Sequence, residues 1–430
     1  MGKHKEIAAH LLTLRIGTLR RSGPNALLLV APSFTNSGVR SSQRTLRLLL
    51  SFRSETNDDM GTRKEAFRSV LIFGGAGFIG SNWAQRLLEQ TEAKVHIFDN
   101  LSRRGSRHNL EFLQKLAGKA GRIQITIGDI REQVKVQRAV KPATEIYHFA
   151  AQVAVTTSIS DPRLDFDINV GGTFNILEAA RTSGNRPFLL FTSTNKVYGD
   201  LSGSTAVAQG TRFVSPVASQ GTNESQPLDF HSPYGCSKGA ADQYVHDYGR
   251  IYGLPTVVFR MSCIAGPRQF GNEDQGWVAH FLYSALLGNP LTLYGTGLQV
   301  RDVLNVADLL NAFDAVREQR DRSVGEIYNV GGGPRNTMSL MELLQELEHF
   351  TGKKVQFQRE ALRPGDQLIY VSDHSKLTRL TGWEPQISVR ATLESIRDWF
   401  KKNRDLFATV REVESPTPVG GTLAELGRTA

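Results

Sequence analysis

The sequence predicts an α/β protein built on a doubly wound parallel sheet, and three observations lead to this class. From residue 70 onward, short apolar runs alternate with segments whose apolar residues have helical spacing. The runs are continuous stretches of Val, Ile, Leu and Phe, as in strands that are buried on both faces. A glycine-rich turn joins the first run to the first helical segment. Alternating strands and helices of this kind form a parallel sheet covered by helices on both faces.

The elements divide the chain into a larger and a smaller part. We expect strands over residues 70–73, 95–99, 123–128, 145–150, 187–193 and 255–260, with helices over 79–90, 168–181 and 236–252 among them. After about residue 265 the pattern becomes mixed, with Gly and Pro between elements and a helix over 338–351. The sequence therefore predicts a Rossmann-type domain over 68–265 and a smaller mixed α/β C-terminal substrate lobe over 266–405. Some of the lobe's chain is expected to cross back to the first domain. The long polar segment over 200–230 is expected to be a functional loop.

The two ends of the chain are not expected to fold. Residues 1–59 hold nine Lys/Arg and four Asp/Glu, so they supply +5 of the net charge of +9. The remainder, at +4, shows no basic stripe with interleaved aromatic residues, which argues against a nucleic-acid partner. The Arg/Ser-rich, acid-poor start is typical of a transit peptide. An unstructured or spurious extension over 1–67 is favoured over a transit peptide, because Met60 stands just before the first strand. Residues 406–430 are expected to be a disordered tail.

Composition also limits the environment of the protein. No apolar run approaches the roughly 18 residues that a membrane span requires, so no membrane partner is expected. Only two cysteines occur, which makes a disulfide framework implausible and favours a reducing, cytoplasmic compartment. No metal site is expected.

The glycine-rich turn predicts a dinucleotide site. Gly74, Gly77 and Gly80 match G-x-x-G-x-x-G, and Gly75 with the last two matches G-x-G-x-x-G, between a strand and a helix. Glycines there permit a tight turn, close approach of the backbone to a pyrophosphate, and close helix–strand packing. The N-terminus of the following helix then presents free N–H groups and a partial positive charge to the phosphates.

The second and third strands end in acids that favour NAD as the cofactor. Asp99 closes the second strand, where a carboxylate accepts hydrogen bonds from the adenosine ribose. The nearby Arg103 and Arg104 suggest the 2′-phosphate of NADP, but Asp99 would repel that phosphate. We therefore expect NAD, with the two arginines solvated or facing the adenine. Asp129 is a candidate for the adenine amino group, although an Asp is also ordinary in a strand-end turn.

A catalytic base is predicted in "SPYGCSKGAADQY". Tyr234 and Lys238 stand four residues apart, so on a helix they share one face. A lysine ammonium near a phenol stabilises the phenolate and lowers the phenol's pKa, and the nicotinamide cation adds to this. Thr194 completes the triad by hydrogen bonding to the reacting hydroxyl, and Ser193 competes for this role. Cys236 has no evident His partner and is expected to be a packed neutral thiol.

These motifs resemble a known group of enzymes. "GGAGFIG", "DNLSRRG", "YHFAAQVAVTTS", "FTSTNKVYGD", "PYGCSKGAADQY" and "RMSCIAGPRQFG" are similar to the extended short-chain dehydrogenase/reductase superfamily, over roughly residues 68–400. "STNKVYGD" and "DFHSPYGCSKGAADQY" resemble more narrowly the subfamily of CDP-paratose 2-epimerases. The spacing from the "VYG" tyrosine, Tyr198, favours Thr194 over Ser193 as the triad hydroxyl.

The resemblance implies further ligand contacts. For NAD, the implied residues are Gly74, Gly77, Phe78, Ile79, Gly80, Asp99, Asn100, Asp129, Ile130, Ala150, Gln152, Asn169, Tyr234, Lys238 and Ser262. For a CDP-hexose, they are Thr194, Gln275, Tyr294, Arg301, Arg363 and Asp366. The two arginines would hold the diphosphate, which suits the guanidinium fork. Asp366 would take the nucleotide ribose, and Tyr294 would lie near the base. Gln152, Asn169 and Gln275 are weaker candidates, because buried amides often only cap loops. A homo-oligomer, either a dimer or a tetramer, is expected.

The residues after Thr194 restrict the reaction. Related 4,6-dehydratases carry an Asp-Glu pair there, which acts as acid and base to eliminate water, whereas this chain has Asn195 and Lys196. Neither an amide nor a charged lysine replaces that pair, so elimination is not expected. The residues therefore favour epimerisation, and the resemblance implies that it takes place at C2 of the sugar. A UDP-sugar 4-epimerase or a nucleotide-sugar reductase is the alternative, and a non-catalytic NAD-sensing protein is a third.

The interpretation of the first residues as dispensable leads to a testable prediction. A chain that begins at Met60 should be expressed in soluble form, bind NAD and turn over substrate like the full chain. Loss of soluble protein, seen by size-exclusion chromatography, would contradict this prediction.

Overall fold

The protein is described by a computed structural model, which covers residues 68–118, 121–201, 205–215, 220–363 and 365–407. The expectations for 1–67 and for 408–430 lie outside the described residues.

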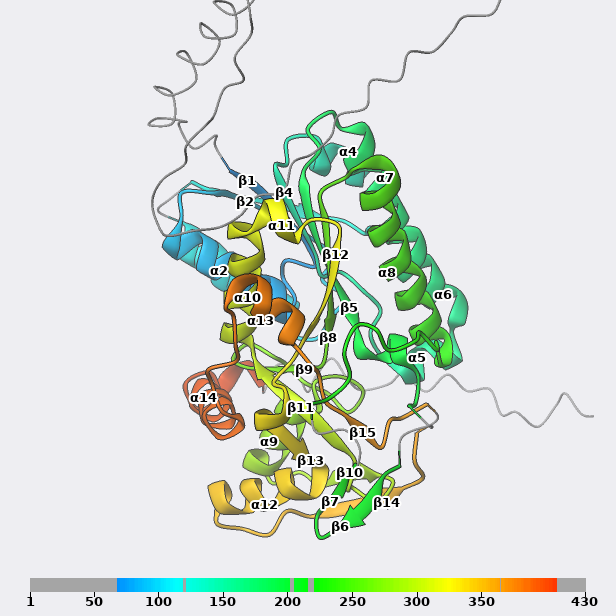
Figure 1. The fold of residues 1–430 in the computed structure, drawn as a ribbon. Coiled ribbons are helices and arrows are strands. Elements are labelled where there is room, and N and C mark those ends of the chain that lie inside the picture. Colours follow the sequence, from blue (N-terminus) through cyan, green and yellow to red (C-terminus); the bar gives the residue numbers. More distant parts are fainter. Residues whose placement is uncertain (1–67, 119–120, 202–204, 216–219, 364, 408–430) are drawn as a thin grey trace, which may run out of the picture. The chain divides into compact units, whose positions relative to one another are not determined.

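Seven parallel strands form the main sheet (Figure 1). Its order is β12-β8-β5-β4-β1-β2-β3, and every neighbouring pair is parallel. The strands are β1 (Ser69–Phe73), β2 (Lys94–Asp99), β3 (Ile123–Ile127), β4 (Glu145–His148), β5 (Phe188–Thr194), β8 (Thr256–Met261) and β12 (Glu326–Val330). The order reverses between β1 and β4, and ligands of doubly wound sheets bind at the carboxyl ends of the strands beside that point. The predicted doubly wound fold is confirmed.

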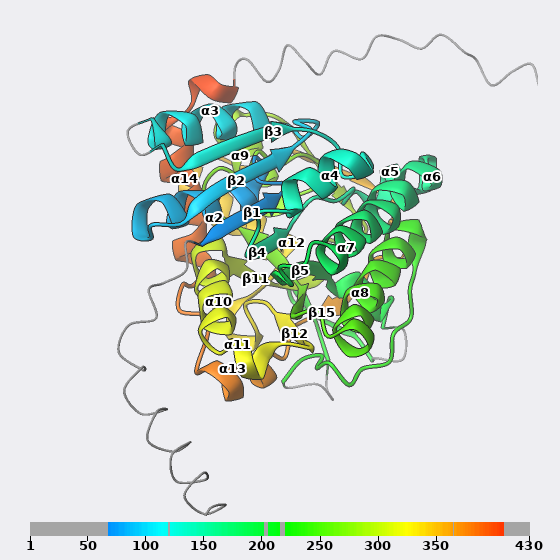
Figure 2. The ribbon, with the colours of Figure 1, turned by 90° about the horizontal axis from the view of Figure 1, so that it is seen from above.

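Helices cover both faces of this sheet (Figure 2). On one face lie α2 (Phe78–Gln90), α3 (Ser106–Ala117) and α10 (Val306–Glu318), and on the other lie α4 (Gln133–Val140), α7 (Thr173–Thr182) and α8 (Ser232–Tyr252). Each face buries its own apolar core. Trp83 and Phe313 belong to the first core, and Ile176 and Val245 belong to the second. The continuous apolar strands are explained by this burial on both faces.

The structure differs from the expected boundaries most clearly at the start of two helices. The helix expected over 236–252 begins at Ser232. The segment expected to be helical from residue 168 begins as a π-helical turn, Asp167–Gly172, before α7 starts. Gly172 stands where an added Cβ would meet the Ile130 side chain at 2.4 Å, so only glycine fits there. Glycine is a poor helix former, which fits an irregular turn at this position.

A second group of elements forms the part that the sequence predicts to be the substrate lobe, and this name is kept for it below. It contains β9 (Cys263–Ala265), α9 (Trp277–Leu287), β10 (Leu291–Tyr294), β11 (Val300–Asn305), β13 (Thr337–Ser339), α12 (Leu340–Thr351), β14 (Phe357–Glu360), β15 (Ile369–Tyr370) and α14 (Val389–Lys402). The chain leaves the lobe to form α10, α11 (Arg320–Ser323) and β12, and again for α13 (Ser375–Thr381). Phe407 packs on Phe270, Tyr283 and Phe400, so the expectation of a disordered tail from residue 406 is wrong for Phe407.

Short elements occupy the loops at the carboxyl ends of the strands. They are α5 (Val155–Ser160), α6 (Pro162–Phe166), the 3-10 turns η2 (Asn195–Tyr198) and η3 (Pro334–Asn336), and the strands β6 (Val207–Gln209) and β7 (Arg212–Val214). β6 and β7 pair as a hairpin inside the segment that the sequence predicts to be a long loop.

A buried ion pair fixes α8 to the sheet. Arg260 on β8 donates from Nε and Nη2 to the two carboxylate oxygens of Asp242, each at 2.9 Å. The side chains are 3% and 0% exposed. The third nitrogen of Arg260 donates to the Tyr198 hydroxyl at 3.2 Å, and that hydroxyl donates to Asn329 at 2.7 Å. The geometry therefore joins α8, η2, β8 and β12 through one guanidinium.

Removal of Asp242 should leave the charge of Arg260 buried without a compensating carboxylate. We expect Asp242→Ala to lower the free energy of unfolding by about 3–5 kcal/mol, measured by urea denaturation. Asp247→Ala removes an exposed pair with Arg250 on the same helix and serves as the control. It should change stability by less than about 1 kcal/mol. Equal effects of the two variants would contradict the role given to the buried pair.

Candidate active site

The glycine turn between β1 and α2 has the geometry that a dinucleotide requires. Gly74 has φ +76, and a Cβ there would meet the Ala150 nitrogen at 2.7 Å. A Cβ on Gly80 would lie 2.2 Å from the Gly74 oxygen, so helix and strand approach too closely for a side chain. Gly77 is the N-cap of α2, and a Cβ there would meet only the Gly74 oxygen, at 3.2 Å. A strand, a glycine turn and a helix N-terminus in this order are what a pyrophosphate site requires.

Asp99 at the end of β2 has a structural role that its sequence position does not reveal. Its carboxylate accepts hydrogen bonds from the backbone N–H of Ala76 at 3.0 Å and of Leu101 at 2.8 Å. Burial raises the pKa of Asp99, and the N–H groups of Leu101, Ala76 and Gly77 oppose this shift. Asp99 therefore holds the glycine turn in shape, in addition to the predicted ribose contact.

Arg103 lies on the catalytic side of this region. It donates to the Ala151 carbonyl at 3.0 Å, and its charge acts on both Asp99 and Tyr234. Burial lowers the pKa of Arg103, and these two groups oppose the shift. Of the two expectations for Arg103, a solvated side chain does not hold, because the guanidinium is partly buried on the Ala151 carbonyl near Asp99 and Tyr234. The other, that it faces the adenine, stays a prediction.

Other cofactor candidates lie around the same strand ends. Phe78 and Ile79 are in the first turn of α2, Ile130 follows β3, and Ala150 packs on Gly74. Asp129 accepts two bonds from Arg131 at 2.9 Å and one from Asn100 at 2.9 Å. Burial raises the pKa of Asp129, but these hydrogen bonds outweigh it and lower the pKa to about 2. Asp129 is thus a carboxylate anion whose oxygens are already bound to Arg131 and Asn100, and its predicted contact with the adenine stays a prediction.

Gln152 and Asn169 belong to a buried polar network. Gln152 donates to Asp165 at 3.0 Å, and Asn169 donates to Asp165 at 3.2 Å and to Ser237 at 3.0 Å. Ser237 in turn donates to Asp165. Ser237 lies on α8 between the two predicted catalytic residues, so the network positions that helix. Asp165 and Ser237 are not among the predicted site residues, because no sequence motif marks them.

Thr194, Tyr234 and Lys238 converge, as predicted for a triad. Thr194 ends β5 and shares a side-chain hydrogen bond with Tyr234 in the first turn of α8. The exposed fractions of the three residues are 8%, 8% and 4%. Lys238 donates to the Thr192 carbonyl at 2.8 Å and lies 4.1 Å from the centre of the Phe191 ring. The Ser193 hydroxyl is buried and has no hydrogen-bond partner within the described residues, so Thr194 is the hydroxyl that meets the phenol.

The pKa of the phenol differs from the sequence expectation. Burial raises the pKa of Tyr234 to about 12, against the hydrogen bond from Thr194 and the charge of Arg103. Burial also lowers the pKa of Lys238 to about 7, against the charges of Asp242 and Asp165. The sequence predicts that Lys238 and the nicotinamide cation together lower the pKa of the phenol, and in the protein alone burial of Tyr234 dominates instead.

Cys236 also departs from the expectation. It is exposed rather than packed, with its sulfur 3.9 Å from the Phe230 carbonyl. The helical repeat of 3.6 residues explains this, since position 236 points away from the buried face that carries Tyr234 and Lys238.

The predicted substrate residues form two groups. In the first, Arg301 donates to Asp366 at 2.6 Å and to the Val300 carbonyl at 2.8 Å, and Lys196 reaches the same Asp366 oxygen at 3.1 Å. The structure thus places Asp366 between two cations. The contact between Lys196 and Asp366 was not predicted from the sequence.

In the second group, the Arg363 guanidinium lies 3.9 Å from the centre of the Tyr294 ring. Arg363 also pairs with Asp274 at 3.4 Å, and the Tyr294 hydroxyl donates to Glu273 at 2.5 Å. Gln275 is exposed in the same loop. Ser262 lies apart from this group and donates to the carbonyl of Asp302 at 3.0 Å.

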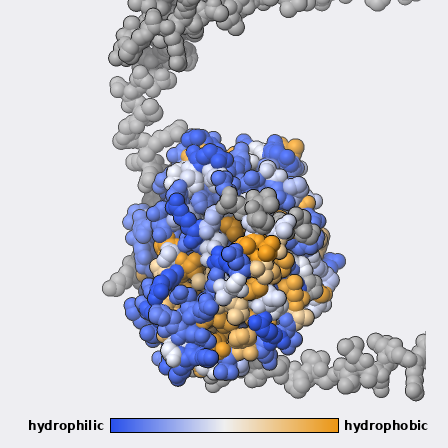
Figure 3. Space-filling view, turned by 60° about the horizontal axis from the view of Figure 1, so that its bottom comes forward, coloured by the Kyte–Doolittle hydropathy of each residue, from blue (hydrophilic) through white to orange (hydrophobic). Residues whose placement is uncertain are grey.

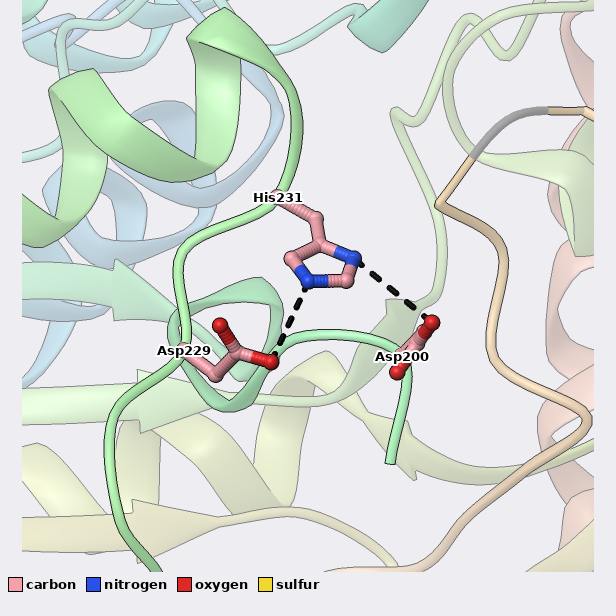
Figure 4. Close-up of side chains that lie close together, drawn as sticks. All are labelled: Asp200, Asp229 and His231. Carbon is pink, nitrogen blue, oxygen red and sulfur yellow. Dashed lines mark ion pairs between the residues drawn. The ribbon is translucent and has the colours of Figure 1, made fainter. Parts of the chain in front are cut away.

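A histidine between two carboxylates lies beside the start of α8 (Figure 4). One ring nitrogen of His231 is 3.1 Å from Asp229 and the other is 3.7 Å from Asp200. These contacts join the loop after η2 to the residue that precedes α8.

Figure 3 shows apolar side chains near the centre of the face that it brings forward, with hydrophilic side chains around them. Exposed apolar residues flank the site loops: Leu228 precedes α8, and Leu362 and Leu368 flank the segment with Asp366. None of the described helices is long and apolar enough to cross a membrane.

Comparisons with known proteins agree with this geometry. A family model described as GDP-mannose 4,6-dehydratase matches residues 71–396. CDP-paratose 2-epimerase of Salmonella typhi is 42% identical over 77% of this chain and 98% of its own length. UDP-glucose 4-epimerase of Thermus thermophilus, solved with NAD, has a TM-score of 0.65 and 33% identity, over 77% of this chain and 99% of that one. dTDP-glucose 4,6-dehydratase of Streptomyces venezuelae, solved with NAD, has a TM-score of 0.67 and 30% identity, over 80% and 99%.

The fold, the glycine turn and the buried triad thus define an NAD-dependent epimerase/dehydratase of the extended short-chain dehydrogenase/reductase superfamily, an enzyme of nucleotide sugars. Within it, the chain belongs to the family described by the GDP-mannose 4,6-dehydratase model, and the recognised similarity to CDP-paratose 2-epimerase is confirmed.

The buried lysine gives a prediction for the pH dependence of stability. Between about pH 7 and the ordinary lysine pKa of about 10.4, the unfolded chain binds a proton that folded Lys238 does not. Stability should therefore rise with pH across this window, by up to about 1.4 kcal/mol per pH unit from this group. Lys238→Met should lack this contribution, so the difference in unfolding free energy, wild type minus variant, should grow from pH 7.5 to 9. A constant difference would contradict the lowered pKa.

Proposed function

We propose that the enzyme is a nucleotide-sugar epimerase that inverts C2 of a CDP-hexose and converts CDP-paratose to CDP-tyvelose. The observation that carries the proposal is the end of β5, where a triad hydroxyl is followed by Asn195 and Lys196. Both side chains contact the 365–367 segment, so neither is free to act as an acid or base on the sugar. The 42% identity to a CDP-paratose 2-epimerase supports the same substrate.

The residues of the triad divide the work of the reaction. Tyr234 accepts the proton of the C2 hydroxyl as that carbon is oxidised, and Thr194 holds the oxygen by a hydrogen bond in both states. When bound, NAD supplies a hydride acceptor and donor and a positive ring that lowers the pKa of a nearby phenol. Lys238, in its protonated form, would add a second positive charge near the phenol. The ketose turns its other face before Tyr234 returns the proton, so substrate and product differ only at C2.

The substrate lobe supplies the diphosphate site in this proposal. Arg301 lies on β11 and Arg363 lies in the loop between β14 and β15, and each offers the planar fork that suits phosphate oxygens. Arg363 already stacks on Tyr294, which would lie beside the base. The assignments of Asp366 to the ribose and of Gln275 to the substrate remain predictions.

The proposed route of the hydrogen can be tested with deuterium. The C–H bond at C2 is not adjacent to a carbonyl and is too weakly acidic for a phenolate to break by proton abstraction. CDP-paratose turned over in deuterated water should therefore give CDP-tyvelose without deuterium at C2, read by NMR. Substrate labelled at C2 should keep its label. Solvent deuterium at C2 would contradict the mechanism, and conversion of a UDP-hexose at C4 instead would assign the chain to the 4-epimerases.

The base assignment predicts a large loss in one variant. Tyr234→Phe should reduce kcat by more than tenfold, a barrier of over about 1.4 kcal/mol, while NAD binding stays close to that of the wild type. Tyr244→Phe, at an exposed position of the same helix, is the matched control and should retain activity. More than a tenth of the wild-type rate in Tyr234→Phe would show that another group accepts the proton.

A further inference from the structure

Asn195 and Lys196, which stand where dehydratases carry their acid–base pair, both contact the substrate lobe. Asn195 donates from its amide to the Gln367 side chain at 3.1 Å, and Gln367 donates to the Gly199 carbonyl at 2.7 Å. Lys196 donates to Asp366 at 3.1 Å and to the Gly365 carbonyl at 3.3 Å. These contacts fasten the 365–367 segment to the carboxyl end of β5, two residues from the triad hydroxyl.

The charges of Lys196, Arg301 and Asp366, which lie together at this contact, do not cancel. One carboxylate, Asp366, lies between the ammonium of Lys196 at 3.1 Å and the guanidinium of Arg301 at 2.6 Å. Burial raises the pKa of Asp366, but Arg301 and Lys196 outweigh it and lower the pKa, so the group is an anion. The cluster of two cations and one anion therefore carries one positive charge in excess. The side chains of Lys196, Arg301 and Asp366 are 20%, 11% and 29% exposed, respectively.

This excess depends on Lys196. Without Lys196, Arg301 and Asp366 would form a neutral pair, and the carboxylate would stand beside any phosphate that approached the guanidinium. A phosphate near a buried carboxylate is repelled, because charges in a partly desolvated site are weakly screened.

We propose that Lys196 is a positioning residue for the diphosphate of the substrate: it neutralises Asp366 beside the phosphate-binding Arg301, and with Asn195 it fixes the substrate-lobe segment to the triad strand. The inference rests on the proposed function, in that it takes Arg301 to hold a nucleoside diphosphate. It assigns a task to Lys196 that is independent of proton transfer.

The test compares binding of charged and uncharged probes by calorimetry. CDP and cytidine, with UDP and uridine as a second pair, are titrated into NAD-loaded protein. Lys196→Met should weaken binding of the nucleoside diphosphate about tenfold or more and leave binding of the nucleoside within about twofold. Lys196→Arg should restore most of the affinity, because it returns the charge. Lys196→Met combined with Asp366→Asn should also regain affinity, because the repelling carboxylate is gone.

Two controls separate this role from a general loss of structure. Lys376→Met removes a partly exposed lysine that contacts the Ile327 carbonyl and Glu326, and it should bind both probes like the wild type. Hydrogen exchange of the 365–370 segment should be faster in Lys196→Met than in Lys376→Met. Equal loss of both probes in Lys196→Met, or no loss of either, would overturn the inference. Absence of nucleoside diphosphate binding by the wild type would instead overturn the proposed function on which it rests.

Discussion

The active site depends on the buried pair of Arg260 and Asp242. Tyr234, Lys238 and Asp242 follow one another at four-residue intervals on α8, so the ion pair and the two catalytic side chains share one helix face. Because the guanidinium is bidentate, it fixes both the rotation and the position of this face against β8. The same guanidinium binds Tyr198, whose 3-10 turn follows Thr194 directly. One desolvated interaction therefore sets the separation of the triad residues.

The surroundings of the triad push the two titrating groups in opposite directions. Burial favours the neutral forms of both, so the phenol keeps its proton and the ammonium releases its proton more easily. The charges that face them come from Arg103 on one side and from Asp165 and Asp242 on the other. A positive cofactor ring would act against the burial of the phenol, and this couples cofactor binding to the readiness of the base.

The fold and the centre of the site could be predicted from sequence because their signals are local. The glycine turn, the strand that ends in Asp99 and the four-residue spacing of Tyr234 and Lys238 each lie within a short segment. The contacts that the sequence did not reveal join distant segments: Lys196 and Asp366 are 170 positions apart, and Asn169 and Ser237 are 68 apart. The exposure of Cys236 and the burial of Arg103 differ from the sequence expectations for a related reason, since burial depends on what packs against a side chain.

The edge strand of the main sheet has a consequence for biosynthesis. β12 pairs with β8 but is made about 70 residues after it, because β9 to β11 and the helices α9 to α11 intervene in the chain. At about 5–20 residues per second, a ribosome needs several seconds to supply this stretch. Throughout that interval the newly made β8 presents an unpaired edge, which is the kind of surface that recruits other chains. A slow codon run or a truncation between β8 and β12 would thus prolong the exposure of this edge to aggregation or chaperone capture. The segment that returns from the substrate lobe supplies β12 and so completes the sheet.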